Sequence, residues 1–151
     1  MRRTYLITIA VGVLLFLFVS AVLARVWSAD GAETDAVTAL VQAEARGDET
    51  AVVDRLQGCR ASVACRTQVA AYVAELRRAG GVSILQMQLS TGFTLSGHLG
   101  SARVAWRSPT SLPIVQCVRV RRAGNAFSGL QIELLALSPR ITSDADCPAR
   151  F

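Results

Sequence analysis

The chain begins with an apolar, uncharged stretch that is long enough to cross a membrane. From Thr4 to Ala24, twenty-one residues carry no charge. About twenty apolar residues in a helix rise 1.5 Å each and span a hydrocarbon layer roughly 30 Å thick, with their backbone polar groups bonded inside the helix. We therefore predict that residues 4–24 form a membrane-spanning helix.

The charges that flank this stretch predict its orientation. Arg2 and Arg3 precede it, whereas the charge of Arg25 is soon offset by acidic residues at positions 30, 33 and 35. Positive residues are enriched on the cytoplasmic side of membrane helices. We expect a single-pass protein of the cell membrane, with its N-terminus in the cytoplasm and its C-terminal domain outside the cytoplasm.

A cleaved signal peptide is the alternative, since Val22-Leu-Ala24 offers small residues of the kind that a signal peptidase accepts. Two features favour an uncleaved anchor instead. The apolar stretch is longer than a usual signal peptide, and Trp27 is suited to the membrane interface. The predicted division is a cytoplasmic stub and anchor at residues 1–28 and an extracytoplasmic domain at residues 29–151.

Three amphipathic helices are predicted at the start of the domain, because apolar side chains recur there every three or four residues with mostly polar residues between them. Gly47-Asp48 ends the first, at residues 33–46, and Asp48 is a suitable N-cap for the second. Gly58 ends the second helix, and Gly80-Gly81 follows the third. The recurring positions are Val37, Leu40, Val41 and Glu44 to Ala45, then Val52, Val53 and Leu56, and then Val69, Tyr72, Val73 and Leu76.

The period then changes to two, which is typical of strands. Residues 114–122 and 130–138 form the last two of four predicted strands, with Ile132 and Leu134 pointing inward and Glu133 outward. The first two strands show alternation at Leu85, Met87 and Leu89 and at Ala102, Val104 and Trp106.

Turn residues lie between the predicted strands, namely Gly97-His98 with Gly100, Pro109 with Pro113, and Gly124-Asn125. Such turns join neighbouring strands in antiparallel fashion. The predicted fold class is therefore α+β, with an N-terminal transmembrane helix followed by about three helices packed on a curved four-stranded antiparallel sheet.

The positive charge of the whole chain overstates that of the domain. Of the sixteen basic residues, all arginine, three lie in residues 1–25, so thirteen face eleven acidic residues and the remaining charge is +2. Nonspecific binding of nucleic acid requires a strong basic field. We therefore expect no nucleic-acid partner.

All four cysteines follow the predicted anchor. An even number in an oxidising compartment indicates disulfides, and four cysteines allow three pairings, of which Cys59–Cys65 and Cys117–Cys147 are favoured here. The first would close a loop between two helices, and the second would hold the C-terminal segment across a strand. A zinc site is disfavoured, because no pair is spaced Cys-x2-Cys and the chain has one histidine. No metal or cofactor is expected.

The run from Ala39 to Leu56, Ala-Leu-Val-Gln-Ala-Glu-Ala-Arg-Gly-Asp-Glu-Thr-Ala-Val-Val-Asp-Arg-Leu, resembles the opening of nuclear transport factor 2-like domains. Two helices joined by Gly-Asp are common there, and the order of helices and then strands is similar over residues 33–138. The resemblance implies a cone-shaped α+β fold. It also implies a role like that of single-pass bacterial relatives, which are accessory proteins of envelope transporters or components of secretion systems.

Enzymes of that family place an acidic or histidine base and a tyrosine acid in the cone, but these positions cannot be mapped onto this chain. Tyr72 is the one tyrosine outside the membrane stretch, and His98 is expected in a turn. Nucleophilic catalysis needs a base beside the nucleophile, and His98 is the one histidine. Asp144 and Asp146 lie in a polar tail that suits capping or solubility. We expect no catalytic residues.

One patterned surface remains. Arg103 and Arg107 share one face of a predicted strand, and Arg119 and Arg121 share a face of the next, which would align them as a stripe. The stripe is a candidate binding surface for an acidic partner, although a solvated face partly balanced by Glu133 is the simpler interpretation. Trp106 is a second candidate, for packing in the core or for stacking on a ligand.

Taken together, these features predict a membrane-anchored extracytoplasmic interaction module that is not an enzyme. Its expected partner is a protein of the cell envelope, and the membrane is contacted through residues 4–24. A carrier of a small apolar ligand or lipid is the alternative function, and an isomerase or cyclase-type enzyme is the third.

Overall fold

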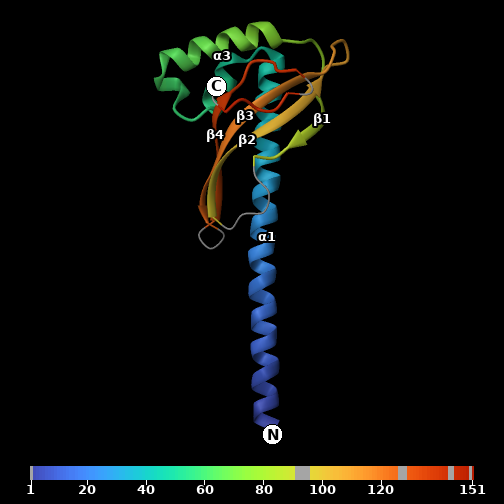
Figure 1. Ribbon diagram of the computed structural model, residues 1–151, viewed down its shortest axis with the longest axis vertical. Coiled ribbons are helices and arrows are strands. Elements are labelled where there is room, and N and C mark those ends of the chain that lie inside the picture. The colour runs from blue at the N-terminus through green and yellow to red at the C-terminus, as the bar shows by residue number, and fades with distance from the viewer. Residues whose placement is uncertain (1, 91–95, 126–128, 143–144, 150) are drawn as a thin grey trace.

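The computed structural model describes residues 2–90, 96–125, 129–142, 145–149 and 151. Figure 1 shows one long helix that forms a stalk and whose upper part lies within an α+β domain. The elements in chain order are α1 (Arg2–Arg46), α2 (Glu49–Arg55), the 3-10 helix η1 (Cys59–Ala61), α3 (Val63–Leu76), β1 (Ser83–Gln88), β2 (Ser96–Arg107), β3 (Ile114–Asn125) and β4 (Gly129–Leu137).

The predicted membrane helix and the first predicted helix of the domain are one continuous element. α1 runs without a break through 45 residues. No proline interrupts it, and Gly31 is tolerated among alanines and other good helix formers. Its apolar half passes the length and composition test for one possible membrane span or a signal sequence.

The short helices begin where the sequence predicts, because each has a side-chain cap. The Asp48 side chain accepts a hydrogen bond from the backbone N–H of Ala51 at 3.0 Å, and the hydroxyl of Ser62 accepts one from Cys65 at 3.2 Å. Gly58, at φ 76°, occupies the left-handed region between α2 and α3. Two caps and one glycine thus set the path of the chain between the helices.

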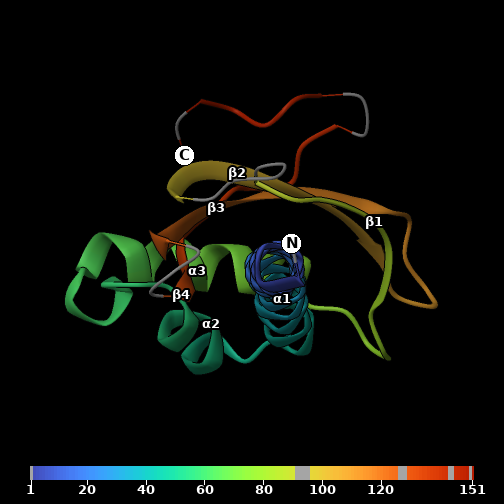
Figure 2. The same ribbon diagram turned by 90° about the horizontal axis from the view of Figure 1, so that it is seen from below.

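The four strands form one antiparallel sheet in the order β1-β2-β3-β4, so the predicted antiparallel pairing of consecutive strands is confirmed. Figure 2 shows the helices on one side of this sheet and the segment after β4 on the other. The sheet is neither curled nor closed. The α+β class is thus confirmed, while the cone implied by the family resemblance is not seen in the described part of the chain.

Two details of the strands differ from the prediction. A register shift between Ile84 and Gln86 leaves Leu85 48% exposed, so Ile84 and Met87, rather than Leu85 and Met87, pack against the core. Two of the three predicted turns are wrong, because Gly97, His98 and Gly100 lie inside β2, with His98 opposite Arg122, and Gly124-Asn125 ends β3. Gly100 serves close packing instead of a turn, since a Cβ there would clash with the carbonyl oxygen of Ser90. Residues 91–95, between β1 and β2, lie outside the described residues.

The core lies between the helices and the inner face of the sheet. Val37, Leu40 and Val41 of α1 are fully buried against it. On the sheet, the predicted inward positions of β2 are confirmed, because Ala102, Val104 and Trp106 are all 0% exposed. The alternation of apolar and polar residues therefore predicts correctly which side chains of β2 face the core.

Candidate functional site

Arg103, Arg107, Arg119 and Arg121 lie on the outer face of the sheet, away from the helices. They do not face one another directly across the strands, as an aligned stripe would require. Arg103 of β2 lies opposite Cys117, and Arg119 of β3 lies opposite Ser101. The two arginines are therefore diagonal neighbours rather than a facing pair. Arg107, at the end of β2, is exposed.

Arg119 holds the C-terminal segment. Its Nη2 donates a hydrogen bond to the carbonyl oxygen of Ala149, and its guanidinium lies 5.2 Å from the ring centre of Phe151. Attraction between a guanidinium and an aromatic face contributes about 0.5–1 kcal/mol at an exposed site. Arg119 is thus engaged within the chain itself.

Arg121 is balanced by an acidic neighbour, as the simpler interpretation of the stripe predicts. It lies opposite Glu133 in the β3–β4 ladder and forms an ion pair with it. Its Nη2 also donates to the side-chain oxygen of Gln57 at 2.6 Å. The outward direction predicted for Glu133 is confirmed by this pair.

The C-terminal segment crosses the outer face of the sheet and is fixed there by a disulfide. Cys117 of β3 is bonded to Cys147, with 5.7 Å between their Cα atoms. Ile141 makes an isolated antiparallel bridge to Val115. Figure 2 shows this segment lying along the side of the sheet opposite the helices.

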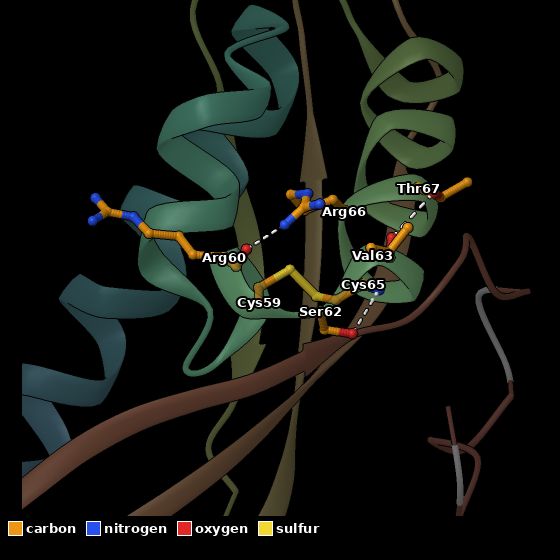
Figure 3. Close-up of a disulfide and its surroundings, with 7 residues drawn as sticks. All are labelled: Cys59, Arg60, Ser62, Val63, Cys65, Arg66 and Thr67. Carbon is orange, nitrogen blue, oxygen red and sulfur yellow. Dashed lines mark hydrogen bonds between the residues drawn. A yellow bond between two sulfur atoms is a disulfide. The ribbon is translucent and has the colours of Figure 1, made fainter.

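The second disulfide, Cys59–Cys65, joins η1 to the first turn of α3, with 5.3 Å between Cα atoms. Figure 3 shows it beside Arg66, which donates a hydrogen bond to the carbonyl oxygen of Arg60 and so closes the same loop. Ser62 caps α3 within this loop. Both predicted pairings are therefore present in the structure.

Trp106 is buried and forms part of a polar chain inside the core. Its indole N–H donates to Oε1 of Gln116 at 2.8 Å, and Nε2 of Gln116 donates to Oε1 of Glu44 at 3.1 Å and to the carbonyl oxygen of Ser138 at 3.3 Å. All of these side chains are at most 1% exposed. Trp106 therefore packs in the core, as one of its two predicted roles requires.

Glu44 is the carboxyl group of this chain of bonds. Burial raises its pKa from 4.5 to about 7; the hydrogen bond from Gln116 opposes the rise, and the charge of Glu75 adds to it. Its second oxygen, Oε2, has no hydrogen-bond partner. A buried carboxyl of this kind can bind and release a proton near neutral pH.

A second buried polar cluster joins α1 to the sheet nearer the apolar stretch. Arg122 of β3 is fully buried, and its guanidinium lies 2.7 Å from Asp30 and 2.7 Å from Glu33, both on α1. Glu33 also accepts hydrogen bonds from the backbone N–H of Ser90 at 2.7 Å and from its hydroxyl at 3.0 Å. Arg122 Nε also donates a hydrogen bond to Glu33 at 2.8 Å, so ion pairs and hydrogen bonds together link α1, β3 and Ser90 at this point. Arg122 Nη1 and Nη2 and Asp30 Oδ1 make ion pairs without a hydrogen bond of good geometry.

Neither buried cluster is among the sites predicted from the sequence. Arg122 has the same parity as the buried residues Val118 and Val120, so alternation along β3 places a charge on the core face and could have indicated a buried partner. Glu44 similarly falls on the apolar face of its helix. An ionisable residue at a core position is the signal that could have found each cluster.

Two open grooves of about 260 Å³ lie at the surface of the domain. One lies between α3 and β4 and is lined mainly by apolar side chains, whereas the other includes Arg55 and Glu133. Ligand pockets usually hold about 300–1,000 Å³. Glu44 lines neither groove. The groove between α3 and β4 is lined by Leu56, Ser62, Cys65, Gln68, Val69, Tyr72, Leu135, Ala136 and Leu137.

Within the described parts of the chain, no three side chains of the types that bind metals converge on one point. The chain matches no protein-family model, no curated protein and no solved structure.

Proposed function

We propose that this chain is a non-catalytic interaction module, anchored in the cell membrane, that presents its extracytoplasmic domain to a protein partner of the envelope. Such a module would serve as an accessory or scaffold of a transport or secretion assembly. The observation that carries the proposal is the continuity of α1, which runs from the apolar stretch into the domain core without a linker.

Rigidity supports this role. Val37, Leu40 and Val41 of α1 are buried in the core, and the ion pairs of Arg122 fix the helix nearer the apolar stretch. A domain on a flexible linker would sample many heights and directions, whereas this domain keeps one orientation relative to its anchor. Binding of a partner then loses less free energy to conformational ordering, because the surface of the domain is already oriented.

The disulfides support a location outside the cytoplasm. Both join residues of the domain, and disulfides persist in oxidising compartments. The helices that precede antiparallel strands also occur in nuclear transport factor 2-like domains, although the open sheet departs from their cone.

The orientation is tested first, with a reporter fused after Phe151 that is active only outside the cytoplasm. Activity is expected in cells that express the full chain. A reporter active only in the cytoplasm would contradict both the anchor orientation and the proposed partner.

The interaction is tested by chemical crosslinking in intact membranes. Wild type is expected to give a discrete adduct with an envelope protein, and a flexible Gly/Ser insertion after Ser28 is expected to weaken it, because the domain loses its fixed orientation. The same insertion after Arg3 is the matched control and should leave the adduct unchanged. Equal adducts in all three proteins would show that a rigid connection is not needed.

A carrier of a small apolar ligand is the second candidate, favoured by the groove between α3 and β4, where Val69, Tyr72 and Leu137 form part of the wall. Mass spectrometry of the full-length protein, extracted gently, distinguishes the two functions. A copurifying apolar molecule that a Leu135→Arg variant loses would support the carrier, because Leu135 lines the groove and is only partly buried. A bound molecule retained by that variant would exclude this groove as its site.

A further inference from the structure

The sheet overlaps the apolar stretch of α1 along the helix axis. Side chains of the apolar stretch are widely exposed at first, 66% at Leu14 and 55% at Phe18, but exposure falls to 37% at Leu23 and Val22 is partly buried. The covering of α1 by the rest of the chain therefore begins before the uncharged stretch ends at Ala24.

The ion pair between Arg122 and Asp30 gives the level of the sheet relative to the anchor. From Asp30 back to Ala24 the helix descends about 9 Å, at 1.5 Å per residue. From Arg122 to Asn125, the last residue of β3, the strand covers about 10 Å at about 3.3 Å per residue. The end of β3 therefore comes level with the end of the apolar stretch. Figure 1 shows this end of the sheet reaching down beside α1, below the level of β1.

The composition of the chain suits a lipid interface at this end. Neither residues 79–102 nor residues 123–132, which contain the start of β2 and the β3–β4 connection, include any Asp, Glu, Lys or Arg. Asn125 pairs with both Ser96 and Gly129, so three uncharged strand ends meet here. Burial of a charge at the edge of the hydrocarbon would oppose such contact, and no such charge is present in these two segments.

We infer that the ends of β2, β3 and β4 nearest the anchor form a second membrane contact, in which Asn125, Gly129 and Leu130 lie among the lipid headgroups. The occupant is the bilayer surface rather than another protein, because the span that fixes the height of the sheet end also places lipids immediately around it. The domain thus rests on the membrane at two points, α1 and the sheet end. This inference rests on the membrane anchor of the proposed function.

The test uses tryptophan fluorescence of the full chain in vesicles of phosphatidylglycerol and phosphatidylcholine, with the phosphatidylcholine brominated near the top of its acyl chains. Bromine quenches tryptophan at short range. The chain has two tryptophans, and Trp27→Phe leaves the buried Trp106 as a constant background. On this parent, Leu130→Trp probes the sheet end. Leu112→Trp, at an exposed position between β2 and β3, is the matched control.

Leu130→Trp is expected to be quenched to within about twofold of Trp27 in wild type, since both would lie in the interfacial layer. Leu112→Trp is expected to show no quenching above the background. Gln131→Trp, at an exposed neighbouring position, repeats the probe if Leu130→Trp lowers the stability of the domain.

Two results would overturn the inference while leaving the anchor in place, provided that Trp27 is quenched. In one, the probe at the sheet end is quenched no more than Leu112→Trp. In the other, both probes are quenched equally, so that contact is not confined to the sheet end. Absence of quenching at Trp27 itself would overturn the anchor and, with it, both the proposed function and this second contact.

Discussion

Arg122 of β3 and Asp30 of α1 lie 2.7 Å apart, six residues beyond the end of the apolar stretch of the helix. Glu33 completes the cluster at 2.7 Å from the same guanidinium, and its side chain is fully buried. This cluster joins α1 to β3 near the last residues of that strand. Its energetics differ from those of a surface ion pair, because an unpartnered buried charge is costly.

We expect Arg122→Met to destabilise the domain by about 3–5 kcal/mol, because it leaves the carboxylate of Glu33 buried without its cation. Adding Glu33→Gln to Arg122→Met should restore part of the lost stability. The substitution removes the buried negative charge, while the amide oxygen of glutamine can still accept a hydrogen bond from Ser90. Urea unfolding of the full-length protein in mild detergent measures both.

Arg121→Met is the matched control for that experiment. Arg121 is the neighbour of Arg122 and pairs with Glu133, but it lies on the exposed face, with its side chain 47% exposed. A pair of this kind contributes about 0–1 kcal/mol. Equal losses for the Arg121 and Arg122 variants would contradict a special role for the buried cluster.

The elements of this fold follow from local signals in the sequence, whereas the clusters do not. Asp48 and Gly58 mark helix ends through interactions with residues a few positions away, so the sequence alone locates them. The two disulfide pairings could be preferred because Cys59 and Cys65 lie in a short loop between two predicted helices, which leaves Cys147 of the C-terminal segment to pair with Cys117 of a strand. The sequence therefore predicts the order and type of the elements and both disulfides, while the continuity of α1 and the first half of β2 differ from the prediction.

The partners of Glu33 and Glu44 depend on contacts between residues far apart in the chain. Arg122 lies 89 positions from Glu33, and Gln116 lies 72 positions from Glu44. Periodicity assigns a residue to a face but does not say which residue of another element it meets. The same limitation explains β1, where a bulge at Leu85 breaks the alternation and changes which side chains face inward.

Stability should fall as the pH rises through the range in which Glu44 ionises. Burial raises the pKa of Glu44 from its ordinary value of 4.5 to about 7 in the folded domain, so the folded state holds the proton more tightly than the unfolded chain does. The stabilisation is complete below pH 4.5 and is lost by pH 7, and a shift of this size corresponds to about 3 kcal/mol.

Glu44→Gln should remove that pH dependence and leave the domain more stable than wild type at pH 8, because no charge need be buried. Urea unfolding at pH 5 and at pH 8 gives the difference for each protein. Glu75→Gln is the control, since Glu75 is exposed and adds only a charge interaction to Glu44. An identical pH dependence in wild type and Glu44→Gln would show that another group is responsible.

Charge reversal at Arg107 tests whether the outer face of the sheet binds the proposed partner. Arg119 holds the C-terminal segment and Arg121 is paired with Glu133, so Arg107 is the exposed arginine of the four that can be changed with least effect on these contacts. Arg107→Glu is expected to reduce the crosslinked adduct several-fold with unchanged unfolding. Arg140→Glu changes the net charge equally, and an equal reduction there would attribute the effect to net charge alone.

The two disulfides should differ in their contribution to stability, because they close loops of different length. Cys59 and Cys65 are separated by 6 positions, and Cys117 and Cys147 by 30. Loop-closure entropy then gives about 2 kcal/mol for the first and about 4 kcal/mol for the second. Replacing each pair with serine and measuring urea unfolding tests this order.

The Cys117/Cys147 variant should also expose the segment after Ser138 to limited proteolysis, whereas the Cys59/Cys65 variant should leave it protected. Equal proteolysis of that segment in the two variants would mean that Arg119 and the Ile141–Val115 bridge hold it without the disulfide.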